Sequence, residues 1–449
     1  MDERPKYFSP EWEVSDPKSL APKIEERLKA QLIYTYGRSP FYRRKFDKAR
    51  IDPSRVGIED LERLPFTVKD EVRQTQEEAP PLGGHACVGW EKISRIHASS
   101  GTTGKPTLVG ATVRDRQMWN ELVARCMWAQ GARPGSRAWV ALSLGWWIAG
   151  LQFLEGLQYL GAAVLPGGNT EPARSFSVVS DTGLDFVIST PSFVQYLANF
   201  ARENDIDLKS LGVKNMGLGG EPGAGNPHTR RQIEDAWGCK VYDCMGTADV
   251  CTVVWSECEA QDGMHFMGQG FVIPEIVDPE TGERIEPVKG AKGELVYTAI
   301  WRECTPLIRY RMNDIIEVVD DAQCSCGRTG YRIRCLGRVD DMLIVRGVNV
   351  YPSAVVDVVR AFRPRVTGHI QIQADGPGPS VEPPVRIRVE YDEEKNLDGL
   401  KREIERAIRS ELIFSPNVEL VEPGTLAPKG SMKTKLVVRK KHEDEVDPH

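Results

Sequence analysis

The sequence predicts an α/β protein: a large N-terminal domain with mostly parallel sheets and a β-rich connector, followed by a small α+β C-terminal domain. Three observations lead to this prediction. Short apolar strands alternate with helical segments between residues 138 and 245, which is typical of parallel sheets. A segment rich in proline and glycine follows at residues 271–293. The chain has 449 residues, more than one hydrophobic core usually serves, so we expect two domains, residues 1–338 and residues 339–449.

The N-terminal part is predicted to be helical. Residues 19–36 carry apolar side chains four positions apart, which places them on one face of a helix, and Gly37 is the expected stop. That face consists of Ile24, Leu28 and Leu32, and we expect it to pack against the core. Residues 65–70 are predicted to start a second helix, with Thr67 as its N-cap.

Four segments define the predicted sheet. Residues 138–166 indicate a strand, a turn and a buried helix, and residues 185–192 indicate a buried strand that ends in a turn. Residues 213–220 and 240–245 are short apolar strands, each followed by a loop with polar or glycine residues. Because ligands of parallel sheets gather at the carboxyl ends of the strands, we expect a binding site there. Its border consists of residues 189–191, 219–221 and 245–246.

The unit after Arg338 is predicted from two regular segments. Residues 385–391 indicate a strand, and residues 397–412 indicate a charged helix. A polar tail starts at Lys440. A compact unit of this size is typical of a separate small domain.

Composition excludes several classes of protein. The net charge of −6 offers no basic surface for nucleic acid or for an anionic membrane. No apolar run approaches the roughly 18 residues that span a bilayer, and the charged start has no apolar segment after it. Ten cysteines are too sparse for a disulfide scaffold, which favours free thiols or metal ligands in a reducing compartment. We therefore expect a cytoplasmic protein.

A loop at residues 97–107, HASSGTTGKPT, is rich in glycine and hydroxyl side chains and carries one lysine. Small residues allow a tight backbone with converging N–H groups, and Ser, Thr and Lys add donors, so the loop suits a polyphosphate. It is not a Walker A loop, because two residues rather than four separate its glycines and Pro106 follows Lys105. A flexible surface loop is the alternative.

Five segments in order resemble the motifs of the adenylate-forming enzymes, the superfamily of acyl-CoA synthetases, adenylation domains and luciferases. They are this loop, Gly-Gly-Glu-Pro at 219–222, Ile-Arg-Tyr-Arg-Met-Asn-Asp at 308–314, Gly-Arg-Val-Asp-Asp-Met at 337–342 and Pro-Lys-Gly-Ser-Met-Lys-Thr-Lys at 428–435. Residues 95–100, 168–171 and 342–352 resemble phenylacetate–CoA ligases in particular. The resemblance implies a mobile C-terminal domain that rotates after the first half-reaction.

The same resemblance implies an ATP-dependent, AMP-forming acid–CoA ligase. Such an enzyme joins a carboxylate to the α-phosphate of ATP, which gives an acyl-adenylate and pyrophosphate, and then transfers the acyl group to coenzyme A. The implied substrates and cofactors are ATP, Mg²⁺, coenzyme A and an aromatic acid of the arylacetate or benzoate type. We also expect a homodimer.

Site residues are carried over from the matching motifs. The implied catalytic residues are Lys433, Lys105 and Asp249, with Lys433 as the cation at the α-phosphate and with Lys429 and Lys435 as alternatives to it. The implied nucleotide contacts are Ser99, Ser100, Gly101, Thr102, Thr103, Gly104, Gly220, Glu221, Pro222, Asp243, Met245, Gly246, Thr247, Asp314 and Arg338. The implied acyl pocket consists of Leu144, Trp146, Trp147 and Gly219, and the implied hinge is Asp340.

Two segments depart from the family pattern. Relatives carry Y-G-x-[ST]-E, whose aromatic ring stacks on adenine and whose glutamate helps to hold magnesium; this chain has Met-Gly-Thr-Ala-Asp at 245–249. Methionine can cover adenine by dispersion, and Asp249 can still bind a hard cation through oxygen. Residues 143–150 are Ser-Leu-Gly-Trp-Trp-Ile-Ala-Gly where phenylacetate ligases carry Y-G-Y-G-L-F-T-G, so the acid can be aromatic without being phenylacetate. Two core tryptophans are the alternative interpretation.

A separate group of residues suits a metal. Three thiols and one imidazole, from Cys258, His265, Cys324 and Cys326, would complete a tetrahedral zinc site with no vacant position, which is typical of a structural site. Some members of the phenylacetate-ligase branch have similar clusters. The alternative is buried or incidental thiols, as we interpret Cys87, Cys126 and Cys239. The remaining thiols, Cys244, Cys251, Cys304 and Cys335, stay ambiguous.

Two other functions remain open at this point. An adenylating enzyme can pass the acyl group to a carrier-protein pantetheine, or pass AMP to an unusual acceptor such as a deazaflavin coenzyme. A catalytically silent, zinc-stabilised nucleotide-binding protein is the second alternative, and the altered residues 245–249 are its only support. The motifs that contain Lys105, Asp314 and Lys433 are intact, which argues against a silent protein.

Overall fold

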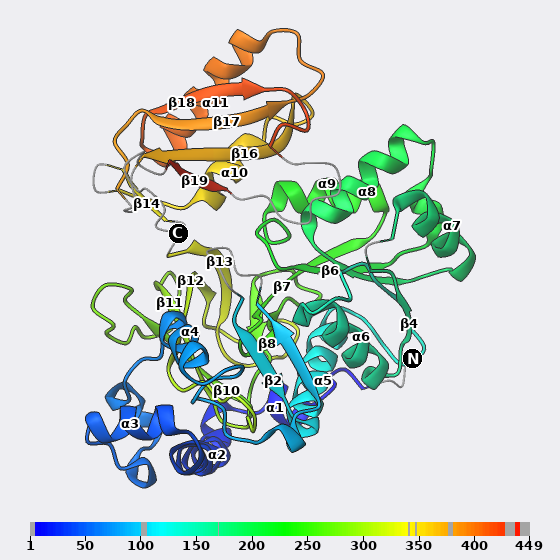
Figure 1. Ribbon diagram of the computed structural model, residues 1–449. Helices are drawn as coiled ribbons and strands as arrows, with labels where there is room; N and C mark the ends of the chain where they lie inside the picture. The colour runs from blue at the N-terminus through cyan, green and yellow to red at the C-terminus, as the bar shows by residue number, and fades with distance from the viewer. Residues whose placement is uncertain are drawn as a thin grey trace.

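The computed structural model describes residues 5–99, 106–168, 170–339, 342–345, 348–375, 380–426 and 436–440. Within these residues one 11-stranded sheet forms the large domain and one 4-stranded sheet forms the C-terminal domain (Figure 1). The α/β class predicted from the sequence is confirmed. None of the described helices is long and apolar enough to cross a bilayer.

The large sheet is mixed, and its two halves differ in strand direction. Its parallel half has the spatial order β4 (Ala163–Pro166), β3 (Arg137–Val140), β5 (Phe186–Ser189), β6 (Asn215–Gly219) and β7 (Lys240–Thr247). Its antiparallel half continues with β8 (Cys251–Ser256), β9 (Met264–Phe266), β13 (Arg332–Arg338), β12 (Tyr310–Asp320), β11 (Lys292–Ala299) and β10 (Val272–Val277). The connector expected from residue 271 onward is thus part of the same sheet as the parallel strands.

Helices cover both faces of the parallel half. One core contains α5 (Val113–Ala129) and α6 (Ile148–Leu160), which pack against the side of β5 that carries Phe186 and Ile188. The opposite core, which contains Val187, is covered by three other helices. They are α7 (Pro172–Thr182), α8 (Pro191–Glu203) and α9 (Pro227–Trp237). The alternation of side chains along β5 explains why this strand is apolar throughout, as strands buried on both faces are.

The N-terminal helices differ from the prediction at two residues. The first long helix does not stop at Gly37 but ends at Arg38, because Ser39 accepts a hydrogen bond from Tyr42 N through its hydroxyl and starts the next helix. Thr67 is not an N-cap: its hydroxyl donates to Ile308 O at 2.8 Å, and Val68 precedes the helix instead. These helices are α1 (Pro10–Glu13), α2 (Pro17–Arg38), α3 (Pro40–Lys48) and α4 (Lys69–Glu78).

Short elements complete the large domain. A two-stranded hairpin consists of β1 (Arg95–Ala98) and β2 (Leu108–Ala111), which pair antiparallel and flank the glycine-rich loop. Short 3₁₀ helices are η1 (Pro53–Arg55), η2 (Ile58–Arg63), η3 (Trp90–Lys92) and η4 (Leu208–Leu211).

The C-terminal domain follows β13 and has its own core. Its sheet has the order β18 (Pro416–Val421), β17 (Val385–Tyr391), β16 (Val366–Asp375) and β19 (Val437–Lys440). Helices α10 (Pro352–Arg360) and α11 (Leu397–Leu412) pack against it, and β14 (Leu343–Val345) pairs with β15 (Val348–Val350). The strand and helix expected in this domain coincide with β17 and α11. Figure 1 shows this domain beside α8 and α9 of the large domain.

Candidate active site

Three strands bring the expected binding segments to one edge of the sheet. Ser189 on β5 pairs with Leu218 on β6, and Leu218 pairs with Asp243 on β7, so the loops that follow these strands leave at the same level. Two glycines on this edge have no room for a side chain. A Cβ on Gly219 would lie 2.3 Å from Cys244 O, and one on Gly246 would lie 2.3 Å from Thr252 O. The close backbone packing at this edge therefore requires glycine.

The hairpin that carries the glycine-rich loop is closed by a pair of hydroxyl residues. Ser99 N donates to Thr107 O at 2.8 Å, and the Thr107 hydroxyl donates to Ser99 Oγ at 2.8 Å. The Ser99 side chain thus holds the two strands together at the base of the loop. Ser100, Gly101, Thr102, Thr103, Gly104 and Lys105 lie outside the described residues.

The expected acyl-pocket segment lies directly beside this hairpin. Ala98 N donates to Trp146 O at 3.0 Å, and Trp147 stands immediately before α6. The Trp146 side chain is 71% exposed, so it is not a core tryptophan. Its ring meets that of Trp147 edge to face, with centroids 6.5 Å apart. Leu144 is half-buried nearby in the chain, and the segment offers an aromatic surface next to the loop.

Asp249 is buried and held by two partners. Its Oδ2 accepts hydrogen bonds from Lys69 Nζ at 3.2 Å and from the Tyr310 hydroxyl at 3.1 Å. Its backbone N–H donates to the Thr247 hydroxyl at 3.4 Å. No hydrogen bond to the other carboxylate oxygen, Oδ1, occurs within the described part of the chain. This oxygen is the one available to a ligand or a cation.

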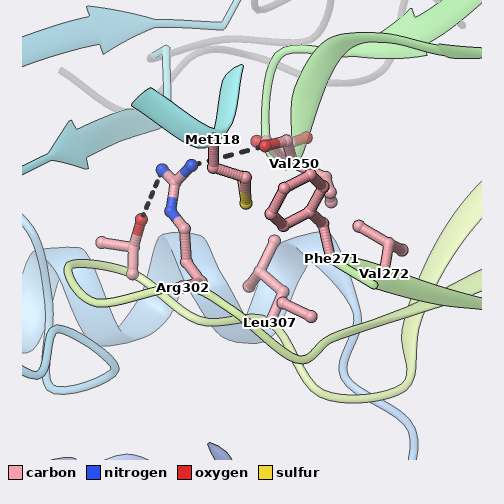
Figure 2. A pocket seen from close by; sticks show the side chains of 9 residues that line it. Met118, Val250, Phe271, Val272, Arg302 and Leu307 are labelled. Atoms are coloured by element: carbon pink, nitrogen blue, oxygen red, sulfur yellow. Dashed lines mark hydrogen bonds between the residues drawn. The ribbon is translucent and has the colours of Figure 1, made fainter. Parts of the chain in front are cut away.

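A small cavity lies behind Asp249, lined by Met118, Phe271 and Arg302 among others (Figure 2). Its volume of about 10 Å³ is at the lower limit for one water molecule, so it is too small for an acid substrate. Arg302 donates to Gly110 O at 2.9 Å on the hairpin and to Val250 O at 3.4 Å next to Asp249. Its guanidinium therefore ties the phosphate-loop hairpin to the Asp249 turn.

Asp314 and Arg338 face each other across two neighbouring strands. Asp314 on β12 pairs with Arg338 at the end of β13, and Arg338 NH1 lies 3.3 Å from Asp314 Oδ1. The expected ribose carboxylate thus sits directly before the expected hinge. Asp340 and Lys433 lie outside the described residues, as do Lys429 and Lys435.

The turn after β6 is fixed by its glutamate. Glu221 Oε1 accepts a hydrogen bond from Ser192 N at 2.6 Å, in the first turn of α8, where a helix favours a negative charge. Gly220 adopts φ +83°, a conformation that favours glycine, and Pro222 follows Glu221. The side chain of Glu221 therefore shapes the loop.

Asp243, in the middle of β7, interacts with the carboxyl of Glu257. Removal from water and the charge of Glu257 raise the pKa of Asp243 to about 8, and Arg230 opposes the shift. Glu257 Oε2 accepts from Asp243 N at 2.8 Å and from Arg230 NH2 at 2.6 Å. Met245, on the same strand, packs against the core of the antiparallel half.

Four side chains predicted as metal ligands come together away from this edge. All four, Cys258, His265, Cys324 and Cys326, are buried, and their ligand atoms lie within 4.8 Å of one another. Cys258 Sγ lies 3.8 Å from Cys324 Sγ, and Cys326 Sγ lies 3.6 Å from His265 Nε2. All ten cysteines are free thiols in the structure.

A buried arginine supports this cluster. Arg328 donates to Cys326 Sγ from its backbone N–H at 3.4 Å and from its guanidinium at 3.7 Å. Glu13 holds the same guanidinium with an N–O distance of 2.7 Å, and the Tyr7 hydroxyl donates to Cys326 O at 2.8 Å. The N-terminal segment therefore covers the cluster.

The sequence did not predict the three residues that lie around Asp249. Lys69 belongs to the segment expected only to start a helix, Tyr310 to the ribose motif, and Arg302 to no motif. Lys69 lies 180 positions from Asp249, so no local spacing joins them. The one signal in the sequence is that Tyr310 lies inside a motif already identified as functional.

Comparison with known proteins identifies the family. The model of the AMP-binding enzyme family matches residues 28–300, and that of the AMP-binding enzyme C-terminal domain matches residues 347–441. The phenylacetate-coenzyme A ligase of Thermus thermophilus is 37% identical over 458 aligned positions, which cover 96% of this chain and all of that protein. This coverage includes both domains.

Solved structures of a 2-hydroxyisobutyryl-CoA ligase are also similar. In its postadenylation state, that protein matches with a TM-score of 0.90 at 29% identity, over 98% of this chain and 94% of the other. In its thioesterification state the TM-score is 0.73, over 98% and 93% of the two chains. The chain belongs to the AMP-binding enzyme family, in the branch of the phenylacetate–CoA ligases, and is an ATP-dependent, AMP-forming CoA ligase.

Proposed function

We propose that this ligase activates an aromatic acid of the arylacetate or benzoate type as an acyl-adenylate and transfers it to coenzyme A. The observation that carries this proposal is the position of the exposed Trp146 ring, next to the base of the phosphate loop. An acid held against an aromatic surface there would place its carboxylate near the α-phosphate of ATP. The similarity to the phenylacetate-coenzyme A ligase of Thermus thermophilus supports the same class of acid.

The first half-reaction needs positive charge around the α-phosphorus, where the carboxylate oxygen attacks and pyrophosphate leaves. We assign this charge to Lys433, with Lys105 at the leaving phosphates. Asp314 would accept the ribose hydroxyls through its carboxylate, steadied by Arg338. The turn at Gly220–Pro222 would border the adenine, since Glu221 anchors that turn to α8.

The side-chain oxygens of Asp249 and Thr247 suit a magnesium ion bound with ATP. When present, this ion would neutralise part of the phosphate charge. Lys69 and Tyr310 fix Oδ2 of Asp249 and leave Oδ1 for this purpose. The second half-reaction would follow rotation of the C-terminal domain about Asp340. The thiol of coenzyme A then attacks the acyl carbon, and AMP leaves.

The cysteine cluster suits a structural zinc ion. Tetrahedral zinc with Zn–S bonds of about 2.3 Å and Zn–N bonds of about 2.0 to 2.1 Å requires sulfurs about 3.8 Å apart and sulfur about 3.5 Å from nitrogen. The Cys258–Cys324 and Cys326–His265 distances of 3.8 Å and 3.6 Å fit these values. Four protein ligands would leave no position for substrate, so zinc would brace the fold. A homodimer and a cytoplasmic location complete the proposal.

An acid panel tests the proposed substrate. Phenylacetate, benzoate, hydroxylated forms of both, 2-hydroxyisobutyrate and acetate would each be supplied with ATP and Mg²⁺, and AMP release would be measured with and without coenzyme A. We expect an aryl acid to give the highest kcat/KM, with release dependent on coenzyme A. Preference for 2-hydroxyisobutyrate or acetate would contradict the aromatic assignment. Adenylation without dependence on coenzyme A would favour a different acceptor.

A further inference from the structure

The C-terminal domain contacts the nucleotide side of the large domain through one helix end. Arg363, just after α10, donates to Gln232 Oε1 on α9 at 3.1 Å and to Gln195 Oε1 on α8 at 3.2 Å. Asp357 on α10 forms a side-chain hydrogen bond with Asn226, the N-cap of α9. These contacts place α10 directly over the loop that joins β6 to α9 (Figure 1).

Arg360, the last residue of α10, lies at the centre of this interface. It is only 8% exposed, and its Nε and NH1 atoms have no hydrogen-bond partner within the described residues. Its guanidinium rests on the turn after β6, because a Cβ on Gly223 would lie 3.0 Å from Arg360 NH1. Through this side chain the C-terminal domain therefore contacts the turn that borders the expected adenine site.

The charges near Arg360 come from both domains. Burial lowers the pKa of Arg360, and the carboxylates of Glu221 and then Asp357 oppose this effect. A buried cation that loses its counter-charge is strongly destabilising. Glu221 belongs to the large domain and is itself anchored to Ser192 N at 2.6 Å. Glu221 thus offsets part of the burial cost of Arg360 only while the two domains are in the present arrangement.

The present arrangement corresponds to one of two known in a relative. The 2-hydroxyisobutyryl-CoA ligase matches this chain with a TM-score of 0.90 in its postadenylation state and of 0.73 in its thioesterification state, although both comparisons cover 98% of this chain. Movement of the C-terminal domain between two such arrangements would separate α10 from α9, and the contacts of Arg360 and Arg363 would then be lost.

We infer that Arg360 and Arg363 form an interdomain latch on the turn at Gly220–Gly223, which holds the C-terminal domain in the arrangement that the relative has in its postadenylation state and has to open before thioester formation. The inference rests on the two-step reaction proposed above. Because Arg360 senses the same turn that borders the adenine, binding of ATP and closure of the latch stabilise each other. Arg360 acts as a positioning residue and touches no reacting atom.

The test variant removes the positive charge of Arg360 and keeps a polar side chain at that position. Arg360→Gln is compared with Arg360→Lys and with the control Arg365→Gln, since Arg365 pairs only with Glu394 and Glu403 of its own domain among the described residues. Pyrophosphate exchange measures adenylation, and CoA-thioester formation from supplied acyl-adenylate measures the second step. We expect Arg360→Gln to slow adenylation roughly tenfold and spare the second step, with Arg360→Lys in between.

Hydrogen exchange gives a readout that needs no acid substrate. In Arg360→Gln, amides of residues 219–226 and of α10 should exchange faster together, and ATP should protect them less than in the unchanged protein. Arg365→Gln should match the unchanged protein in both assays. Equal loss of both half-reactions, or unchanged exchange in both segments, would overturn the latch. If the unchanged protein adenylates no acid, the proposed function fails, whereas hydrogen exchange still tests the latch.

Discussion

At the residue scale, Asp249 shows how the altered family motif can still serve a cation. It is one methylene shorter than the glutamate of relatives, and its placement depends on residues far away in sequence. Lys69 and Tyr310 hold one oxygen at 3.2 Å and 3.1 Å, which fixes the direction of the other. Although Asp249 departs from the family motif, its carboxylate therefore has a defined position.

Lys433 carries the sharpest prediction for the chemistry. Lys433→Ala should reduce adenylation by roughly a hundredfold or more, because a cation placed where transition-state charge develops supplies this stabilisation. Thioester formation from supplied acyl-adenylate should stay nearly normal. Lys435→Ala is the matched control and should keep both steps. Equal loss in both steps for Lys433→Ala would move the catalytic role to another residue.

Asp243 predicts how stability depends on pH. Its pKa is raised from 3.8 to about 8 by burial and by Glu257, so the folded protein holds this proton more tightly than the unfolded chain does. The resulting stabilisation is complete below about pH 4 and is lost as the pH rises to about 8. Asp243→Asn should therefore flatten the fall of the unfolding free energy over this range, by at most about 1.4 kcal/mol per pH unit.

Denaturant unfolding at several pH values measures this effect. The control is Asp278→Asn, because backbone N–H groups of Thr281 and Glu280 lower the pKa of that exposed carboxyl. Its contribution to stability is lost only as the pH falls through that low pKa, so the slope above pH 4 should not change. An identical slope in Asp243→Asn and the unchanged protein would show that this carboxyl is ionised throughout.

At the element scale, the cysteine cluster joins the segment after β8, strand β9 and the loop after β12. Cys258 follows β8, His265 lies on β9, and Cys324 and Cys326 lie in the loop after β12. Arg328 links the cluster to Glu13 near the N-terminus. A bound ion would thus link two loops and strand β9 of the antiparallel half.

Cys324→Ser tests this structural role. The unchanged protein should contain about one zinc per chain by elemental analysis, and the variant should lose it together with roughly 5 °C or more of melting temperature. Cys239→Ser removes another buried thiol and should keep the metal. Protein prepared without chelators that holds no stoichiometric zinc, with an unchanged melting temperature for Cys324→Ser, would leave these residues as ordinary thiols.

At the scale of the whole molecule, the two half-reactions that we propose would require two arrangements of the domains. Asp340→Pro should restrict the backbone at the hinge, so adenylation should survive while thioester formation from supplied acyl-adenylate falls roughly a hundredfold. Asp340→Ala, which keeps the backbone free to rotate, is the matched control and should retain both steps. Normal overall turnover of Asp340→Pro would refute the hinge assignment.

Local patterns were sufficient for much of the fold and for the kind of chemistry. Apolar spacing predicted the strand that became β17 and the helix that became α11, because each buries one regular face. Ordered motifs identified the family, since a phosphate loop needs small residues and donors in one short stretch. The cysteine cluster was predicted from ligand type together with the resemblance to related ligases, and its side chains do converge.

Tertiary structure decided what depends on residues distant in sequence. Thr67 is polar and precedes a helix, yet it bonds Ile308 O because that carbonyl lies beside it in the folded chain. Trp146 is as apolar as a core residue, and only the fold leaves it 71% exposed beside the hairpin. Lys69 reaches Asp249 across 180 positions, and Arg360 meets the Gly223 turn across the domain interface. Such contacts form because packing of whole elements brings these side chains together, and no local periodicity records that packing.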